Sequence, residues 1–508
     1  MEATVSGSFL RLTQRLSLRR RPGSDDKRRT AIGITDEKRA SETSRPGRTK
    51  RYAAPLTKER ICHAPGGKVF RDVHLSIPTQ SCTKERGSDI PSQERDGVFL
   101  FAVTEQARAD LWTGGKLHEQ REFRIPRSDS HFFEDNQIQK LGAELAKHGS
   151  RILLIYGSER LKSTPLYASI LEQVKSAGLT LFEMGGVEPN PRHTTVDRAA
   201  GICRDKNIDV LLAVGGGSVT DCAKLTSPTV FHNGTCWDFL TGRAQMKKFL
   251  PIVTISTISG TGTDMDCLGI VNNIETREKT FFGNPALYPA ASFLDPTEAF
   301  TVSPYQTACG AIDAFIHYLE VYFMRPNLYV LDRVMEGFMK TILHFIPVVM
   351  KEPDNYEARG NIMWASSWAL NRFTFGPTNG TPFMCHWIED EVSAKYDITH
   401  GLGLAIILPH YLEYCLNEKS AHLYHELAVN VFGLSPDLDP MEARHQVIAR
   451  LRKLFFETCG LKSRLSECGV TGTDKFPEMA RAACRGGVIH GFVDLTQQDD
   501  INILTASF

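Results

Sequence analysis

The sequence lacks several features that would each point to a particular class of protein. Its 508 residues carry no net charge at pH 7, because 59 basic side chains balance 59 acidic ones. No CxxC pair occurs among the 12 cysteines, which leaves a structural zinc motif or a thioredoxin-like motif without support. No run reaches the roughly 18 uninterrupted apolar residues of a membrane span. GxGxxG is also missing, so the standard Rossmann fingerprint is absent.

The zero net charge conceals an asymmetry between the two ends of the chain. The first 60 residues hold 16 basic and 7 acidic side chains, so the remainder carries a net charge of −9. A mildly acidic body lacks the positive field that broad binding to nucleic acids or anionic membranes requires. We therefore expect no nucleic-acid partner and no membrane partner.

The composition of the N-terminal quarter of the chain is not that of a folded domain. Residues 1–127 are basic, polar and rich in Arg, Ser and Pro, which predicts a disordered extension. The first 21 residues resemble an organellar transit peptide. A plain disordered tail, or a start codon assigned too far upstream, explains them equally well. The expected location is therefore cytoplasmic, or mitochondrial or otherwise organellar if this segment is a transit peptide. The thinly spread cysteines suggest buried free thiols in a reducing compartment.

The rest of the chain shows two different sequence patterns. Between residues 128 and 300, apolar strand-like runs alternate with helical patterns, which predicts a parallel sheet covered by helices. From 301 to 508 long helical patterns dominate. We therefore predict an α/β domain followed by an all-helical domain.

A glycine-rich turn follows one buried strand, where Gly215, Gly216, Gly217 and Ser218 precede a helix. Glycines allow close approach to a pyrophosphate, and the helix supplies free N–H groups and a positive dipole end. A tightly packed turn without a ligand is an equally good interpretation of this motif alone.

A second small-residue loop strengthens the interpretation as a cofactor site. It follows the next strand and carries the hydroxyls of Thr257, Thr261 and Thr263 beside two glycines. Two such loops at strand ends favour a bound dinucleotide over coincidence.

A metal site is predicted in the helical half. Asp313 and His317 are separated by four residues, which places both on one helix face. His386 and His400 follow later in apolar stretches. A lone histidine in such a stretch is more often a core residue than a ligand. One carboxylate and three imidazoles nevertheless suit Fe²⁺ or Zn²⁺.

Together these motifs resemble the iron-containing (group III) alcohol dehydrogenase family, and within it the NADP-dependent butanol dehydrogenase and aldehyde reductase branch. The resemblance runs from Phe133 to Phe508. The matching strings are EMGGVEPNP (183–191), AVGGGSVTDCAK (213–224), SGTGTD (259–264), LYPAASFLDP (287–296), GAIDAFIHYLEVYF (310–323) and DITHGLGLAIILP (397–409).

The resemblance implies a fold, an activity and a set of roles. The fold is an α/β dinucleotide-binding domain followed by a helical metal-binding domain, as in dehydroquinate synthase, with the site in the cleft between them. The activity is hydride transfer between NAD(P)H and a primary alcohol or aldehyde, with the metal as Lewis acid, and homodimers are expected. The implied metal ligands are Asp313, His317, His386 and His400. The implied cofactor residues are Gly215, Gly216, Gly217, Ser218, Thr257, Thr261, Thr263 and Lys279, with Asp221 near the nicotinamide.

Two positions depart from the family pattern. The family usually has histidine where this chain has Asp390, four residues after a metal ligand, so Asp390 is a candidate proton relay. In addition, FEDN stands where the family has an FGKG-type turn at residues 133–136, and the usual strand before it is hard to find.

The choice of dinucleotide is predicted from the end of the first long strand. Gly157 and Ser158 occupy the positions where an NAD-preferring site often has an acid, although Glu159 follows at once. A 2′-phosphate is then not repelled, and Arg160 or Lys162 can pair with it. We therefore predict NADPH, with NADH as the alternative.

Other functions stay open at this stage. They are a glycerol-dehydrogenase-like polyol oxidation, a hydroxyacid–oxoacid transhydrogenase, a dehydroquinate-synthase-like lyase, and a metal-free binding protein without activity. Retention of all four ligand residues argues against the last of these. The lyase would need a cluster of Lys and Arg for a phosphorylated acid, and the ligand region holds mainly acids.

Overall fold

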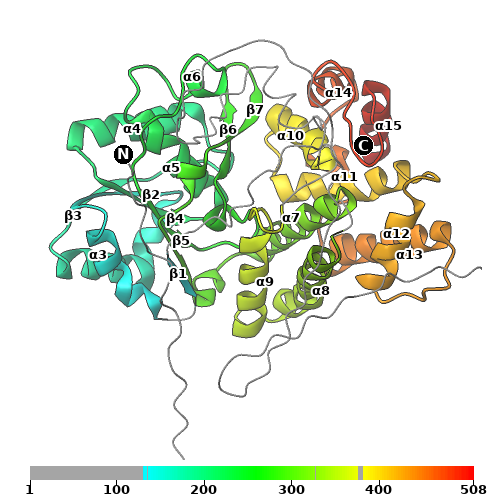
Figure 1. The fold of residues 1–508 in the computed structure, drawn as a ribbon, viewed down its shortest axis with the longest axis horizontal. Coiled ribbons are helices and arrows are strands. Elements are labelled where there is room, and N and C mark those ends of the chain that lie inside the picture. Colours follow the sequence, from blue (N-terminus) through cyan, green and yellow to red (C-terminus); the bar gives the residue numbers. More distant parts are fainter. Residues whose placement is uncertain (1–129, 134–135, 326–327, 376–381) are drawn as a thin grey trace, which may run out of the picture. The chain divides into compact units, whose positions relative to one another are not determined.

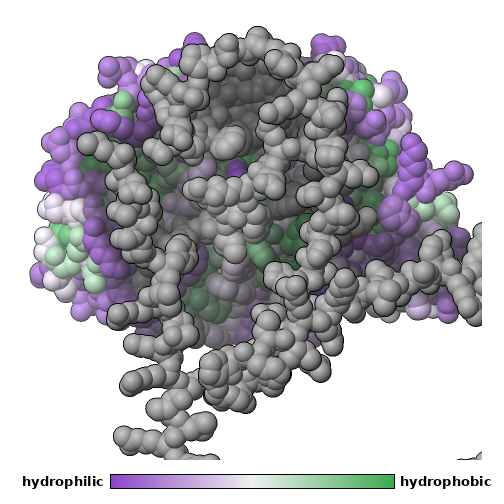
Figure 2. Space-filling view, in the orientation of Figure 1, coloured by the Kyte–Doolittle hydropathy of each residue, from purple (hydrophilic) through white to green (hydrophobic). Residues whose placement is uncertain are grey.

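The computed structural model describes residues 130–133, 136–325, 328–375 and 382–508. The extension predicted over residues 1–127, with its transit-peptide hypothesis, lies outside these residues. Hydrophilic side chains lie around the margin of the face shown in Figure 2, and hydrophobic ones show deeper within it.

An all-parallel sheet forms the first half of the described chain (Figure 1). In spatial order its strands are β1 (Ser130–Phe133), β8 (Ala291–Leu294), β5 (Ile252–Ser256), β4 (Val210–Gly215), β2 (Arg151–Tyr156) and β3 (Thr180–Met184). The helices of this half are α2 (Leu141–Ala146), α3 (Pro165–Ser176), α4 (His193–Lys206), α5 (Gly217–Thr229) and α6 (Trp237–Leu240).

Helices cover both faces of this sheet, which is why its strands are continuous apolar runs. On β2, Leu153 and Ile155 pack into one core with side chains of α4 and α5. The alternating residues Ile152 and Leu154 pack into a second core with α2 and α3. The parallel sheet covered by helices, predicted for this half of the chain, is therefore confirmed.

Two strands lie outside the main sheet. β6 (Leu268–Asn273) and β7 (Glu278–Gly283) form an antiparallel hairpin. The hairpin matters for the site because α10 packs against β7.

Short 3₁₀ segments occupy 137–140, 159–163, 263–265, 285–287, 296–299 and 465–468, and a π-helical turn occupies 453–458.

The second half of the described chain is helical (Figure 1). Its helices are α7 (Pro304–Phe323), α8 (Tyr329–Lys351), α9 (Tyr356–Trp368), α10 (Met384–Tyr396), α11 (His400–Tyr414), α12 (Ala421–Asn430), α13 (Pro440–Arg452), α14 (Phe476–Ala483) and α15 (Gln497–Ser507). From Thr307 onward nearly every residue of α7 is buried, so this helix runs through the core.

The predicted fold class, an α/β domain followed by a helical domain, is confirmed. Its predicted division at about residue 300 falls between β8 and α7, although the exact domain bounds stay a prediction. The cysteines within the described ranges are free, and all except Cys468 are buried, as the sequence suggested. Among the same residues, every helix is too short or too polar to cross a lipid bilayer.

Candidate metal and cofactor site

The metal-ligand candidates come from three helices. Asp313 and His317 lie on α7, His386 lies near the start of α10, and His400 is the first residue of α11. Asp313 and His317 share one face of α7 because they are four residues apart. All three helices belong to the same hydrophobic core, which holds these side chains in place.

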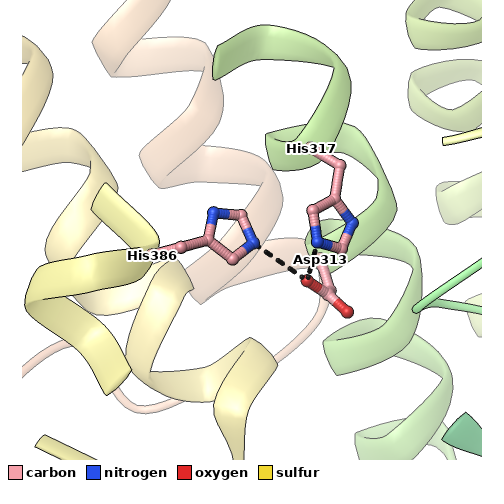
Figure 3. Close-up of side chains that lie close together, drawn as sticks. All are labelled: Asp313, His317 and His386. Carbon is pink, nitrogen blue, oxygen red and sulfur yellow. Dashed lines mark ion pairs between the residues drawn. The ribbon is translucent and has the colours of Figure 1, made fainter. Parts of the chain in front are cut away.

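Three imidazole nitrogens converge on a single carboxylate oxygen of Asp313. The Nε2 atoms of His317 and His386 lie 3.6 Å and 3.5 Å from Oδ1 of Asp313, and Figure 3 shows both rings turned toward it. Nε2 of His400 lies 3.7 Å from the same oxygen. These separations exceed those of ordinary hydrogen bonds. They match ligand atoms bound to one shared ion, which at tetrahedral angles lie about 3.4 Å apart.

The donor atoms are also left without partners in a buried place. Neither Oδ1 of Asp313 nor Nε2 of His386 has a hydrogen-bond partner among the described residues. The side chains of Asp313, His317 and His386 are all buried. Unpartnered polar atoms in the interior are costly and rare, so this pattern calls for a ligand at their meeting point. The residues therefore fit a divalent metal ion.

Two further carboxylates contact the Nδ1 atoms of two imidazoles, on the side of each ring away from Asp313. Glu320 contacts Nδ1 of His386, and its other oxygen accepts the backbone N–H of Cys385 at 2.6 Å. Glu389 contacts Nδ1 of His400. A carboxylate at Nδ1 fixes the ring and leaves Nε2 for a metal. Sequence reasoning missed both acids.

The charge of the site favours a bound cation. Four carboxylates surround the site, those of Asp313, Glu320, Glu389 and Asp390. They face one ammonium group, that of Lys279. A surplus of negative charge in a buried place is costly without a cation.

The pKa shifts point the same way. Burial alone would raise the pKa of Asp313, but the neighbouring imidazoles lower it well below its usual value. Burial alone would lower the pKa of His386, but the Glu320 and Asp313 carboxylates raise it to about 10. Burial lowers the pKa of His317 to about 3, which keeps that ring neutral and able to coordinate.

Lys279 reaches this site from the hairpin. Its Nζ atom lies 2.8 Å from Oδ1 of Asp390 and 3.3 Å from Nδ1 of His400. Its side chain is 3% exposed. The residue that the family resemblance assigns to the cofactor therefore also borders the metal ligands.

The glycine-rich turn opens α5 as predicted. Gly216 caps the helix, and Gly217 is its first residue. A Cβ atom at Gly217 would lie 2.5 Å from Oγ1 of Thr261. Only glycine lets the first cofactor loop touch the second, so the structure brings these two predicted loops together.

Hydrogen bonds join the loops at neighbouring strand ends. The hydroxyl of Ser218 donates to the carbonyl of Pro189, which follows β3. The N–H of Thr257 donates to the carbonyl of Gly215 at 2.9 Å. The loops after β3, β4 and β5 therefore form one edge, where ligands of parallel sheets bind.

The end of β2 joins the same edge. The N–H of Gly186 donates to the carbonyl of Gly157 at 2.8 Å. Ser158 caps the short helix that follows, because its Oγ accepts the N–H of Arg160 at 3.2 Å.

Asp221 and Thr263 are engaged inside the protein. The hydroxyl of Thr263 donates to Oδ1 of Asp221 at 2.7 Å, and the N–H of Ile270 donates to Oδ2 at 3.1 Å. The buried Lys224 donates to Thr263 at 2.8 Å and pairs with Asp266 at 2.6 Å. Burial raises the pKa of Asp221. These are the contacts of positioning residues, while the predicted role of Asp221 near the nicotinamide stays a prediction.

The second cofactor loop rests directly on the metal-binding helix. A Cβ atom at Gly260 would lie 2.9 Å from Cα of Gly310, and one at Gly310 would overlap the carbonyl of Ser259. Gly310 lies on α7, three residues before Asp313. The loop predicted to hold the cofactor therefore touches the helix that supplies two metal ligands.

Comparison with known protein families shows which family the chain belongs to. The model described as iron-containing alcohol dehydrogenase matches residues 128–296, and the C-terminal model of the same family matches residues 307–508. The chain belongs to the iron-containing alcohol dehydrogenase family. The predicted resemblance is thereby confirmed, and this chain is an NAD(P)-dependent oxidoreductase of the alcohol dehydrogenase and aldehyde reductase type.

Relatives of known name agree with this assignment. This alcohol dehydrogenase is 38% identical over 380 residues to NADH-dependent butanol dehydrogenase A of Clostridium acetobutylicum, covering 74% of this chain and 97% of the relative. It is 31% identical over 364 residues to the NADPH-dependent aldehyde reductase YqhD of Escherichia coli, covering 71% and 91%. The crystal structure of NADH-dependent butanol dehydrogenase A from Thermotoga maritima superposes with a TM-score of 0.71 at 30% identity, covering 77% of this chain and 98% of that one.

Proposed function

We propose that this alcohol dehydrogenase reduces short and medium-length aldehydes, and oxidises the matching primary alcohols, at one divalent ion. The proposed ligands are Asp313, His317, His386 and His400. The observation that carries the proposal is the convergence of three Nε2 atoms on one unpartnered carboxylate oxygen. When bound, a divalent ion supplies Lewis acidity toward the substrate oxygen, and a nicotinamide dinucleotide supplies hydride exchange with the substrate carbon.

The remaining residues of the site hold and orient the metal ligands and the dinucleotide. Glu320 and Glu389 fix the rings of His386 and His400 through their Nδ1 atoms. The N-terminus of α5, with its glycine-rich turn, offers free N–H groups to a pyrophosphate. Asp390 stays a candidate proton relay, held by its ion pair with Lys279.

We propose Fe²⁺ as the resident ion, with Zn²⁺ as the alternative. The donor set contains imidazole and carboxylate and no thiolate, which suits both ions. Metal analysis of the purified full-length chain, followed by reconstitution with each ion separately, tests this choice. Activity restored by Zn²⁺ and not by Fe²⁺ would reverse it.

We propose NADPH as the preferred dinucleotide. No acid occupies Gly157 or Ser158 at the end of β2, although Glu159 follows at once, and the exposed Arg160 comes after it. Lys162 is already paired with Glu159 at 3.1 Å and with a second glutamate, so Arg160 is the residue we expect to bind a 2′-phosphate. The ratio of kcat/KM for NADPH and NADH tests this, and a ratio below one refutes it. The butanol dehydrogenases named above are NADH-dependent, which makes the measurement informative.

The decisive experiment for the function is an NADPH- and NADH-oxidation screen over straight-chain aldehydes with the full chain. Oxidation that depends on both aldehyde and metal supports the proposal, and its absence with either ion and either dinucleotide refutes it. We also propose a homodimer, from family resemblance, and sedimentation analysis measures it directly.

A further inference from the structure

The proposed second cofactor loop ends in a buried turn at residues 262–265. The side chains of Thr263, Asp264 and Met265 are all buried there. The N–H of Met265 donates to the carbonyl of Gly262 at 2.9 Å, which closes the turn. A buried turn needs partners for its polar groups, so those partners identify the elements that hold it in place.

Two neighbouring side chains of this turn reach different halves of the described chain. The hydroxyl of Thr263 donates to the carboxylate of Asp221 on α5. The carboxylate of Asp264 instead accepts the hydroxyl of Ser367, near the end of α9. Ser367 is 1% exposed and Asp264 is 5% exposed. The turn therefore links α5, which opens with the glycine-rich turn, to a helix of the second half.

The backbone of the turn also rests on the end of α9. Nδ2 of Asn371, three residues after α9, donates to the carbonyl of Met265 at 2.8 Å. Gly262 has a φ of 68°, and a Cβ atom there would lie 2.7 Å from the carbonyl oxygen of Ser366. The end of α9 thus fixes the turn by direct backbone contact as well as through the Ser367 hydroxyl.

We propose that Asp264 and Ser367 are positioning residues for the nicotinamide end of the dinucleotide. They act through Thr263 on Asp221, which the family resemblance places near the nicotinamide. This inference rests on the proposed function, because it assigns the dinucleotide to the loops after β4 and β5. The glycine-rich turn keeps its own contacts when Ser367 is changed. Loss of the Ser367 hydroxyl should therefore loosen the nicotinamide end and leave the pyrophosphate end bound.

Two ligands that differ by the nicotinamide isolate this effect. NADPH and 2′-phospho-ADP-ribose share the adenosine, the 2′-phosphate and the pyrophosphate, and calorimetric titration of the full chain with each needs no turnover. Ser367→Ala should weaken NADPH binding about tenfold, the cost of a lost buried hydrogen bond, and leave 2′-phospho-ADP-ribose binding unchanged. Equal weakening for both ligands, or unchanged NADPH binding, overturns the inference.

The same helix provides a matched control. Ser366 is also a buried serine of α9, and its hydroxyl has no hydrogen-bond partner among the described residues. Ser366→Ala makes the same change one position earlier and should bind both ligands as the wild type does. If it weakened NADPH binding as much as Ser367→Ala does, a general loosening of α9 would explain both results and the inference would be wrong.

A double variant separates positioning from stability. Ser367→Ala alone leaves the buried Asp264 carboxylate without its donor, so the free energy of unfolding should fall. Adding Asp264→Leu removes the carboxylate, and most of that stability should return because both partners are then apolar. NADPH binding should stay weak in the double variant. Recovery of NADPH binding together with stability would show that the contact only supports the fold, which refutes the inference.

The same titrations distinguish this inference from the proposed function. A wild type that binds neither NADPH nor NADH refutes both. A wild type that binds NADPH more tightly than 2′-phospho-ADP-ribose, with a Ser367→Ala variant that keeps the same difference, refutes the inference alone. If NADH is the preferred dinucleotide, NADH and ADP-ribose replace this pair of ligands with the same expected results.

Discussion

The ammonium nitrogen of Lys279 lies 2.8 Å from Oδ1 of Asp390, and this ion pair joins the β6–β7 hairpin to helix α10. The hairpin belongs to the half of the chain that holds the proposed cofactor loops, and α10 supplies a proposed metal ligand, His386. The family usually has histidine at position 390. Aspartate in its place supplies the negative partner that a buried ammonium needs.

Removing the charge of Asp390 should slow the reaction. Asp390→Asn leaves the Lys279 ammonium without its nearest carboxylate partner, and we expect kcat to fall about tenfold, consistent with the loss of a charge-assisted hydrogen bond. Steady-state kinetics across pH are the measurement. A pH–rate profile identical to that of the wild type would remove Asp390 from the relay role.

A double-mutant cycle tests whether the two residues act as one unit. Lys279→Met alone should also lower kcat, and the double variant should lose less than the sum of the two single losses. Fully additive losses would contradict coupling through the ion pair.

Glu320 should control metal affinity without being a ligand. Glu320→Gln keeps the size of the side chain but removes the charge behind Nδ1 of His386, and metal affinity should weaken about 10- to 100-fold. Competition with a chelator, followed by metal analysis, measures this. Glu357→Gln changes an exposed glutamate of α9 and serves as the matched control. Equal affinities for the two variants would contradict the role.

Lys224 should be essential for stability. Its buried ammonium donates to Thr263, Asp266 and a backbone carbonyl. Lys224→Met leaves the Asp266 carboxylate buried and unpaired, which costs about 3–5 kcal/mol. Denaturant unfolding should show this loss, and KM for the dinucleotide should rise because Thr263 loses its donor. Unfolding at the wild-type midpoint would show that the network contributes little.

Asp500 should make stability depend on pH. It is buried in α15, where Oδ2 lies 3.1 Å from the Cys484 thiol, and burial raises its pKa to about 7. The folded state then binds a proton that the unfolded state releases near pH 4. The free energy of unfolding should therefore fall as pH rises from about 4 to about 7 and level off above. Denaturant unfolding at pH 5 and pH 8 measures it.

The variant Asp500→Asn carries no proton to lose. It should lack this part of the pH dependence and exceed the wild type at pH 8 by on the order of 4 kcal/mol. Parallel curves for the two proteins would contradict the assignment.

Local patterns predicted the parts of the site that lie close together in sequence. The i, i+4 pair on α7 and the glycine turn after β4 follow from helical spacing and strand-end chemistry alone. Glu320 was missed, although it lies on the same face of α7 seven residues after Asp313. Only the fold shows that it meets His386, 66 positions away. The partners of Lys224 were hidden for the same reason.

The first strand was hard to find for a different reason. β1 is a strand of four residues at the edge of the described sheet, and β8 is its only partner among the described strands. Four residues provide too few alternations for a pattern to stand out from the polar sequence before them. Its partner, about 160 positions later, is what makes it a strand.

The contact between Gly260 and Gly310 has a consequence for how this enzyme can change over time. If the loop after β5 holds the dinucleotide and α7 holds the metal, as proposed, their relative position depends on two backbones in direct contact, with no side chain between them to be exchanged. Substitutions elsewhere in the site leave this backbone contact in place, so such an architecture can change which substrates it accepts while the two halves keep their spacing.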